Sequence, residues 1–248
     1  MGIGAYIIGD EIIRGKRQDR HFTKLIEILA GRGLRLDWSC YLADKPALLV
    51  EHFQRSLAGD DIVFSFGGIG ATPDDHTRQA VARAAGVELA QHPDGLAEVR
   101  ARFGDQITPN RLQLIEFPVG SRIIPNPFNR IPGFSYADHH FVPGFPQMAW
   151  PMAEWVLETH YPQLFHGVAE SERSFIVWEG NEGNLIDLMR RIEADYAGIT
   201  VSSLPSFGDE TTRRHVELGV RGEPAQVESA YAVMRAEVAA LGLDVQEL

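Results

Sequence analysis

The amino-acid sequence predicts an α/β fold, in which a three-layer αβα sandwich with a mostly parallel sheet is followed by a small α+β domain. Short apolar runs alternate with amphipathic stretches over residues 5–85, which is the rhythm of βαβ units whose sheet is covered on both faces. After residue 172 the pattern changes to strand-like stretches and two helices. The length of 248 residues allows between one and two domains at about 150 residues each.

The elements of the first half follow from apolar spacing and from the positions of glycine and proline. Apolar residues recur at helical intervals between Phe22 and Leu29, and Gly31 and Gly33 are natural stop residues for that helix. Pro46 suits the first turn of a second helix. The predicted strands cover residues 5–8, 34–42 and 61–66, and the predicted helices cover residues 22–29, 46–57 and 77–85.

The middle of the chain is less regular. Residues 91–113 have an interrupted helical pattern, and prolines divide residues 117–146 into short extended pieces. Residues 141–142 are a candidate strand there, and a helix over residues 146–158 closes the first unit. The polar, weakly patterned residues 160–172 are the expected linker.

The last third of the chain predicts the small α+β domain, because short strand-like runs alternate with amphipathic helices. We therefore place the two domains at residues 1–165 and 172–248. The predicted strands of the second domain cover residues 174–178, 199–204 and 215–220, and its predicted helices cover residues 184–192 and 225–241.

Charge and composition exclude several classes of function. The net charge of −11 disfavours a broad contact with duplex nucleic acid or with an anionic membrane, so we expect neither as a partner. No apolar run reaches the length of a membrane span, and the single cysteine, Cys40, cannot form an intramolecular disulfide. We therefore expect a soluble cytoplasmic protein. Residues 11–35 are locally basic and could receive phosphate.

A glycine-rich segment follows the third predicted strand and precedes a predicted helix. Gly67, Gly68 and Gly70 allow the backbone to turn sharply and to bring several N–H groups close to an anion. Ala71 and Thr72 complete this candidate phosphate-binding loop. The spacing matches neither a Walker A motif nor GxGxxG. The alternative is that residues 72–75 only cap the helix.

Carboxylates follow the same strands. Asp10 comes after the first strand and Asp44 after the second, while Asp74 and Asp75 follow the glycines. In a doubly wound sheet these positions meet beyond the carboxyl ends of the strands, where a divalent cation could bridge acid and phosphate. Taken singly, each acid is better explained as a turn or cap residue, and it is their common location that favours a ligand site.

Several ordered motifs lie within residues 3–160. They are Gly9-Asp10-Glu11-Ile12-Ile13, Gly15, Gln18-Asp19, Gly67-Gly68-Ile69-Gly70-Ala71-Thr72, Asp74-Asp75, Thr77, Asn110-Arg111-Leu112-Gln113, Asn126-Pro127, Ile131-Pro132-Gly133-Phe134 and Val142-Pro143-Gly144-Phe145-Pro146. Together these motifs resemble one family, the MoaB/Mog molybdopterin-binding domain. Within that superfamily the sequence is most similar to the N-terminal domain of competence/damage-inducible protein A (CinA) and to the molybdopterin-binding-like domain of eukaryotic FAD synthase.

The resemblance implies a small phosphorylated ligand, either a nucleotide or a pterin, and a homo-oligomer. In the CinA and FAD synthase branch it implies hydrolysis of nucleotide pyrophosphates with a divalent metal such as Mg²⁺, Mn²⁺ or Co²⁺. Asp10, Asp44 and Asp75 would then be the catalytic acids, and Asp10, Asp74 and Asp75 would hold the metal. The MoaB/Mog branch implies molybdopterin as the ligand and adenylyl transfer in molybdenum cofactor biosynthesis.

The sequence departs from the family pattern beside this loop. The branch commonly has Gln-Asp-Thr-Asn where this chain has Gln18 and Asp19 followed by Arg20 and His21, which changes charge and hydrogen bonding next to the ligand. Asp19, Arg20 and His21 are therefore candidate substrate-binding residues. A third possibility is a non-catalytic module that holds an anion with Arg17 and Arg20.

Asp138-His139-His140 is a second candidate metal cluster. We favour instead a turn that enters a strand, because adjacent strand residues point to opposite faces and cannot readily share one ion.

Overall fold

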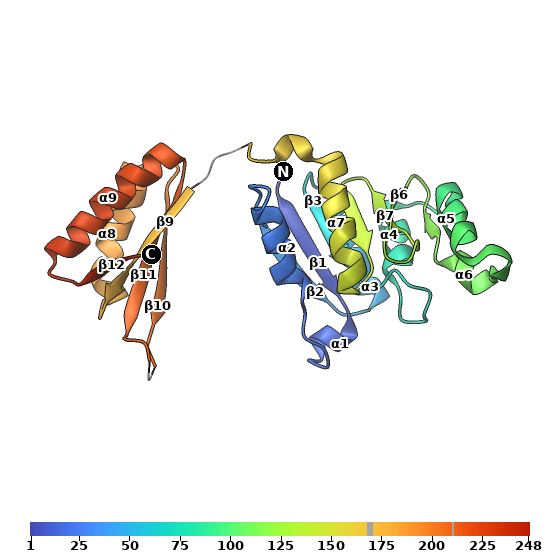
Figure 1. Cartoon of the computed structure of the whole chain (residues 1–248), viewed down its shortest axis with the longest axis horizontal. Coiled ribbons are helices and arrows are strands. Elements are labelled where there is room, and N and C mark those ends of the chain that lie inside the picture. The colour runs from blue at the N-terminus through green and yellow to red at the C-terminus, as the bar shows by residue number, and fades with distance from the viewer. Residues whose placement is uncertain (168–170, 210) are drawn as a thin grey trace. The chain divides into compact units, whose positions relative to one another are not determined.

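A computed structural model describes residues 1–167, 171–209 and 211–248, and these fall into two compact units, Met1–Gly167 and Val168–Leu248 (Figure 1). The first unit contains the predicted sandwich, and the second contains the predicted α+β region. Among the described residues, none of the helices combines the length and the apolar character that crossing a membrane requires.

A six-stranded sheet forms the middle layer within residues 1–167, in the order β2-β1-β3-β8-β7-β6. The pairs β1–β2, β1–β3 and β3–β8 are parallel, whereas β7 is antiparallel to both of its neighbours. The mostly parallel sheet is therefore confirmed. Its strands are β1 Ile3–Ile8, β2 Trp38–Leu42, β3 Ile62–Phe66, β6 Arg122–Ile124, β7 Gly133–Tyr136 and β8 His139–Val142.

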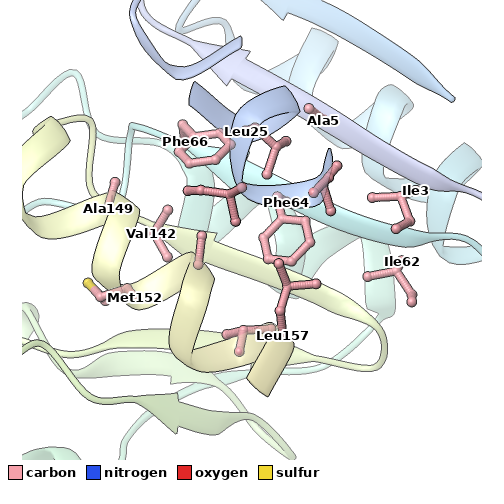
Figure 2. Packing of buried hydrophobic residues seen from close by; sticks show 14 of the residues in the cluster. Ile3, Ala5, Leu25, Ile62, Phe64, Phe66, Val142, Ala149, Met152 and Leu157 are labelled. Atoms are coloured by element: carbon pink, nitrogen blue, oxygen red, sulfur yellow. The ribbon is translucent and has the colours of Figure 1, made fainter. Parts of the chain in front are cut away.

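Helices cover both faces of this sheet, which confirms the three layers. Helices α2 (His21–Ala30) and α7 (Pro146–His160) cover one face, where Phe64 of β3 packs with Leu25 of α2 and Leu157 of α7 (Figure 2). On the other face, Leu49 and Phe53 of α3 (Pro46–Leu57) and Val81 of α4 (Thr77–Ala85) pack against Val63 and Phe141. Every residue of β1 and β3 is buried, as expected for central strands of a parallel sheet.

After α4, a small two-stranded antiparallel sheet and the helices between its strands extend the first unit; we call this part the β4–β5 segment. Strands β4 (Leu89–Gln91) and β5 (Glu116–Pro118) pair with each other, and the chain between them forms three short helical elements. The interrupted helical pattern predicted for residues 91–113 is thus confirmed. The three elements are α5 Pro93–Phe103, the 3₁₀ turn Gly104–Gln106 and α6 Pro109–Gln113.

The second unit has the chain order β-α-β-β-α-β, with an antiparallel sheet ordered β10-β11-β9-β12 among its described residues. This is the ferredoxin-like arrangement. Helices α8 and α9 share one apolar core with the sheet, which includes Phe175, Leu188, Leu218 and Met234. The elements are β9 Ser171–Trp178, α8 Glu182–Asp195, β10 Thr200–Ser206, β11 His215–Gly222, α9 Pro224–Ala240 and β12 Val245–Glu247.

Two predicted boundaries were wrong. Residues 34–37 do not extend β2, because the parallel register with β1 begins at Trp38 and the Asp37 carboxylate instead accepts the backbone N–H of Ile3 at 2.7 Å. The linker predicted at residues 160–172 is too wide: α7 runs through His160, a 3₁₀ turn spans Pro162–Leu164, and β9 begins at Ser171. Residues 168–170 of that stretch lie outside the described residues.

The two adjacent histidines serve separate faces of the sheet. Asp138 lies in the turn before β8, and both histidines lie in the strand. His139 Nε2 lies 2.8 Å from Ser56 Oγ on α3, whereas His140 contacts Ser135 and Tyr161 on the other side.

His140 belongs to a buried chain of hydrogen bonds. The Tyr161 hydroxyl donates to Asp138 Oδ1 at 2.9 Å, so its oxygen accepts from His140 Nε2 at 2.8 Å. The other ring nitrogen, Nδ1, then accepts from Ser135 Oγ at 2.8 Å. The ring is fully buried, and burial holds the pKa of His140 well below its usual value. The chain ties β7 and β8 to the end of α7.

Replacing the hydroxyl at the centre of this chain should destabilise the first unit. In Tyr161→Phe, the buried His140 Nε2–H loses its acceptor, which costs about 1–3 kcal/mol. Urea unfolding should show a lower midpoint with an unchanged slope. Tyr136→Phe is the control, because no partner of the Tyr136 hydroxyl is found among the described residues. An unchanged midpoint for Tyr161→Phe would show that the chain contributes no stability.

The buried histidines should make the protein less stable in acid. Burial lowers the pKa of His139 to about 4, so between pH 6.5 and 4 the unfolded chain binds a proton that the folded chain does not. The free energy of unfolding should therefore fall as the pH falls through that window, by about 1.4 kcal/mol per pH unit for each such histidine. Urea unfolding at several pH values should show that the free energy of unfolding falls less steeply with falling pH in His139→Gln than in the wild type. A flat profile from pH 7 to 4.5 contradicts the prediction.

Candidate functional site

The candidate site lies where the parallel strands end. Gly9 follows β1, Asp44 lies just beyond β2, Gly67 follows β3, and Gly144 lies just beyond β8. Gly67 is held between its neighbours, because its N–H donates to Val142 O at 3.0 Å and an added Cβ would lie 2.3 Å from Ile8 O. Only glycine fits this position, with its φ of +103°.

The carbonyl oxygens of the glycine loop, residues 67–72, are bound by the first two residues of α4. Thr77 Oγ1 donates to Gly67 O at 3.1 Å, and the Thr77 N–H donates to Gly68 O at 3.0 Å. The Arg78 guanidinium donates to Gly70 O through Nη2. Three carbonyl groups of the loop are therefore turned toward the start of the helix.

This arrangement fixes the direction of the amide protons. The described chain has no cis peptide bond, and in a trans peptide the N–H points opposite to the C=O. The N–H groups of Gly68, Ile69 and Ala71 consequently point away from α4. Among the described residues, no acceptor is found for the N–H groups of residues 68–71. Backbone amides that have no acceptor within the protein are the kind of group that can bind an anion.

Asp10 and Asp44 form a reciprocal pair beside this loop. The Asp10 N–H donates to Asp44 Oδ2 at 2.8 Å, and the Asp44 N–H donates to Asp10 Oδ1 at 3.2 Å. Asp10 Oδ2 accepts from Arg14 Nη2 at 2.7 Å, whereas Asp44 Oδ1 has no donor among the described residues. A Cβ built on Gly68 would lie 3.6 Å from that oxygen and 2.3 Å from Thr77 Oγ1, so Asp44 Oδ1 lies close to Gly68, the first residue of the row of free amides, on the side that faces Thr77.

Burial raises the pKa of Asp44, and the neighbouring charges of Glu11, Asp10 and Asp74 raise it further, although the bond from the Asp10 amide acts in the opposite direction. Three other carboxylates are thus close enough to be felt at Asp44. This negative cluster would repel a phosphate unless a cation accompanied it.

Asp74 and Asp75 close the end of the glycine loop. Asp75 Oδ2 accepts both the N–H and the hydroxyl of Thr72, and Asp74 Oδ1 lies 2.6 Å from that hydroxyl. Bonding to Thr72 lowers the pKa of Asp74. An added Cβ at Gly70 would lie 2.4 Å from Asp75 Oδ2, so the acid sits directly against the loop. Asp75 Oδ1 is left for other partners.

The three candidate substrate-binding residues at the start of α2, Asp19, Arg20 and His21, differ in their contacts. Asp19 caps α2, because its carboxylate accepts the N–H groups of His21 at 2.8 Å and Phe22 at 3.1 Å and the hydroxyl of Tyr41 at 2.8 Å. The Asp19 oxygens are therefore engaged within the protein. The Arg20 guanidinium lies 5.6 Å above the ring of Trp150 and is otherwise exposed.

His21 is a buried neighbour of the loop. Its ring stacks on Phe66 at 4.6 Å, and its Nε2 lies 3.1 Å from Gly144 O, which requires the proton on Nε2. Burial lowers the pKa of His21, so the ring is neutral at pH 7. The ring packs against the end of β3 and fixes the start of α2 there.

A metal fits this site only together with a ligand. Among residues 1–167, 171–209 and 211–248, no three His, Cys, Asp or Glu side chains gather as the ligands of one ion. Mg²⁺ is usually bound by one or two carboxylates together with substrate phosphates and water, rather than by an all-protein cage. Asp10 and Asp44 meet that requirement, whereas Asp74 and Asp75 lie at the far end of the loop.

Comparison with known proteins assigns the family. A family model described as a probable molybdopterin binding domain matches residues 4–166. The chain belongs to this molybdopterin-binding domain family. The match covers all the residues of the candidate site, and the resemblance to the MoaB/Mog superfamily inferred from the motifs is confirmed.

Proteins described as CinA-like are among the relatives of this family member. One from Citrifermentans bemidjiense is 34% identical over 173 residues, which cover 66% of this chain and 41% of that protein. Another from an Anaeromyxobacter species is 33% identical over 230 residues, which cover 90% of this chain and 55% of that protein. The chain thus spans about half the length of the curated relatives it matches.

A solved structure supports the fold of this molybdopterin-binding domain. The crystal structure of CinA from Thermoplasma acidophilum, described as a protein of unknown function, superposes with a TM-score of 0.58 at 25% identity. The superposition covers 64% of this chain and 98% of that one. The predicted α/β sandwich of the MoaB/Mog type is thereby confirmed.

Two residues that shape the loop were missed as site residues in the sequence. Thr77 is one of the family motif residues but carries no predicted role, and Arg78 lies outside the motifs. The spacing offered a signal, because Arg78, Val81, Ala82 and Ala85 share one face of α4, and an arginine on an otherwise apolar face needs buried partners.

The hydroxyl of Thr77 should be necessary for the loop geometry. Thr77→Val keeps the shape of the side chain but removes the bond to Gly67 O, so the affinity for inorganic pyrophosphate should fall by about tenfold, whereas Thr77→Ser should stay close to wild type. Isothermal titration calorimetry with Mg²⁺ present measures both variants. Equal affinities for the two variants would contradict the role of this bond.

Proposed function

We propose that this CinA-like molybdopterin-binding domain binds a nucleotide with a phosphoanhydride group and hydrolyses its pyrophosphate bond, using a divalent metal. The observation that carries the proposal is the row of free amides at residues 68–71 beside the uncommitted oxygen Asp44 Oδ1. An anion site next to a carboxylate brings together a means of holding phosphate and a means of accepting a proton.

The glycine loop would hold the phosphate group. Its free N–H groups are fixed before the ligand arrives, because Thr77 and Arg78 already hold the carbonyl oxygens. Donors arranged in advance need no reorganisation when negative charge grows on the phosphate oxygens in the transition state. The loop would therefore stabilise the transition state more than the ground state.

Asp44 would act as the general base. Water adds across the phosphoanhydride: its oxygen bonds to phosphorus, the bridging P–O bond breaks, and two phosphate esters result. Asp44 Oδ1 would take the proton of the attacking water, and its raised pKa suits that task better than an ordinary carboxylate. The Asp10 amide holds the other oxygen of Asp44 and so orients the base.

Asp10 and Asp44 are also the residues that would hold the metal. A bound divalent ion would neutralise phosphate charge and lower the pKa of water. Arg14 limits what Asp10 can offer, because it occupies Asp10 Oδ2 in a salt bridge at 2.7 Å. When a cation binds, Arg14 would have to release Asp10 Oδ2 or share this oxygen with the cation.

A second candidate is adenylyl transfer to molybdopterin, since the matched family is described as a probable molybdopterin binding domain, a description that names the ligand and no reaction. It uses the same anion site but needs ATP and a pterin together. The two reactions therefore differ in whether AMP is released without a second substrate.

Wild-type protein should release AMP from one or more dinucleotide diphosphates. ADP-ribose, FAD, NAD and diadenosine phosphates are each incubated with Mg²⁺, Mn²⁺ or Co²⁺, and AMP is measured by chromatography, with EDTA as the control. Metal-dependent release supports the hydrolase. Silence across the panel, with consumption of ATP only when molybdopterin is added, would support the transferase instead.

Asp44→Asn should lower AMP release by about 100-fold or more, because the amide cannot accept the proton. Ligand affinity measured without added metal should change far less, since the amide oxygen can still accept the Asp10 N–H. The control is Asp187→Asn, a fully exposed carboxylate of the second unit. Unchanged turnover in a folded Asp44→Asn variant would remove Asp44 from the mechanism.

A further inference from the structure

Arg78 is a buried arginine beneath the glycine loop. It is the second residue of α4, and its exposed fraction is 2%. Lysine and arginine are almost never fully buried without a carboxylate or phosphate partner. The partners of such a residue therefore indicate what it does.

The partners of Arg78 are carbonyl oxygens. Its Nη2 donates to Gly70 O, and its Nη1 donates to Gln113 O and, at 3.2 Å, to Glu116 O. Among the described residues, no carboxylate forms a salt bridge with it, and its buried Nε has no acceptor. Carbonyl groups orient the guanidinium but carry no net charge, and the carboxylates of Glu116 and Asp75 act on it only from beyond salt-bridge distance, so its positive charge is only partly compensated.

The location of the Arg78 guanidinium relative to the loop peptides determines how it acts on the loop. The guanidinium lies on the carbonyl side of the Gly70–Ala71 peptide, whose N–H points to the opposite side. Arg78 thus polarises this peptide and turns its donor outward. An anion bound at the free amides would face a dipole whose other end is held by a buried cation.

We propose that Arg78 is the positioning and specificity-determining residue of the glycine loop: it aims the Ala71 N–H at the ligand and makes the site prefer a pyrophosphate group to a single phosphate. The inference rests on the proposed function, because it takes the glycine loop as the phosphate site. The preference follows from charge, since a buried cation attracts the more highly charged pyrophosphate more strongly than orthophosphate. It also follows from geometry, because the loop offers amides at both its Gly68 and Ala71 ends.

The test compares two variants of Arg78 with a matched control in the full chain. Arg78→Met removes the charge and the fork, Arg78→Lys keeps the charge but cannot span three carbonyls, and Arg83→Met removes an exposed arginine from the same helix. Affinities for inorganic pyrophosphate and for orthophosphate are measured by calorimetry with Mg²⁺ present. Amide NMR spectra of ¹⁵N-labelled protein follow Ala71, and urea unfolding reports stability.

For Arg78→Met, the affinity for pyrophosphate should fall by about tenfold or more and that for orthophosphate by less, because the buried charge and the bond that orients the Ala71 N–H are both lost. Arg78→Lys should restore part of the preference for pyrophosphate but not the shift of the Ala71 amide on binding. Arg83→Met should match wild type. The ratio of the two affinities is the decisive readout, since a merely less stable protein would lose both equally.

Four results would overturn the inference. One is a folded Arg78→Met protein with the wild-type affinity ratio, and another is wild-type protein in which pyrophosphate shifts other loop amides but leaves Ala71 unmoved. If Arg78→Met does not fold, the test rests on Arg78→Lys. Wild-type affinities together with a wild-type Ala71 shift in Arg78→Lys would then refute the positioning role. Wild-type protein that binds neither pyrophosphate nor ADP-ribose would overturn the proposed function itself, and this inference with it.

Discussion

The candidate site depends on where the carbonyl oxygens of the glycine loop are placed. A peptide group has a donor and an acceptor that point in opposite directions, so a loop can offer its N–H groups to a ligand only if its C=O groups have partners elsewhere. Thr77 and Arg78 supply those partners from the first turn of α4. The glycines allow the required backbone angles, but these two side chains hold the backbone there.

The charges around the loop divide into two groups. The buried guanidinium and the free amides attract negative charge, while Asp10 and Asp44 on the neighbouring strand ends repel it. Such an arrangement suits a ligand that arrives with a cation, because each group of charges then meets its opposite. Without the cation the acids would disfavour phosphate, and their charges add to the burial that raises the pKa of Asp44.

The sequence predicted most of the fold and the location of the site, but not its internal bonding. Periodicity located the central strands and helices, because burial on both faces produces apolar runs that only a covered parallel sheet explains. It extended β2 too far, since Leu34 and Leu36 pack against the core without entering the ladder. The short helix α1, Asp10–Ile13, was missed because four residues carry no periodicity.

At the site, the acids and glycines were visible as residue types, but their partners were not. Nothing in the spacing of Asp10 and Asp44 indicates that each accepts the other's amide, because the two positions are 34 residues apart. Asp19 was expected at the ligand, and the structure shows that its carboxylate also caps α2, a local contact that the sequence did not indicate.

Arg78 also connects the glycine loop to a segment that has no other evident part in the chemistry. Its guanidinium donates hydrogen bonds to Gln113 at the end of α6 and to Glu116 at the start of β5. The β4–β5 segment, which lies between α4 and β6 in the chain, is therefore bonded through Arg78 to the glycine loop. Insertions or deletions near residues 104–113 would therefore alter the loop without touching any residue in it. The β4–β5 segment is thus a place where evolution or a protein engineer could change ligand choice without altering the glycine loop itself.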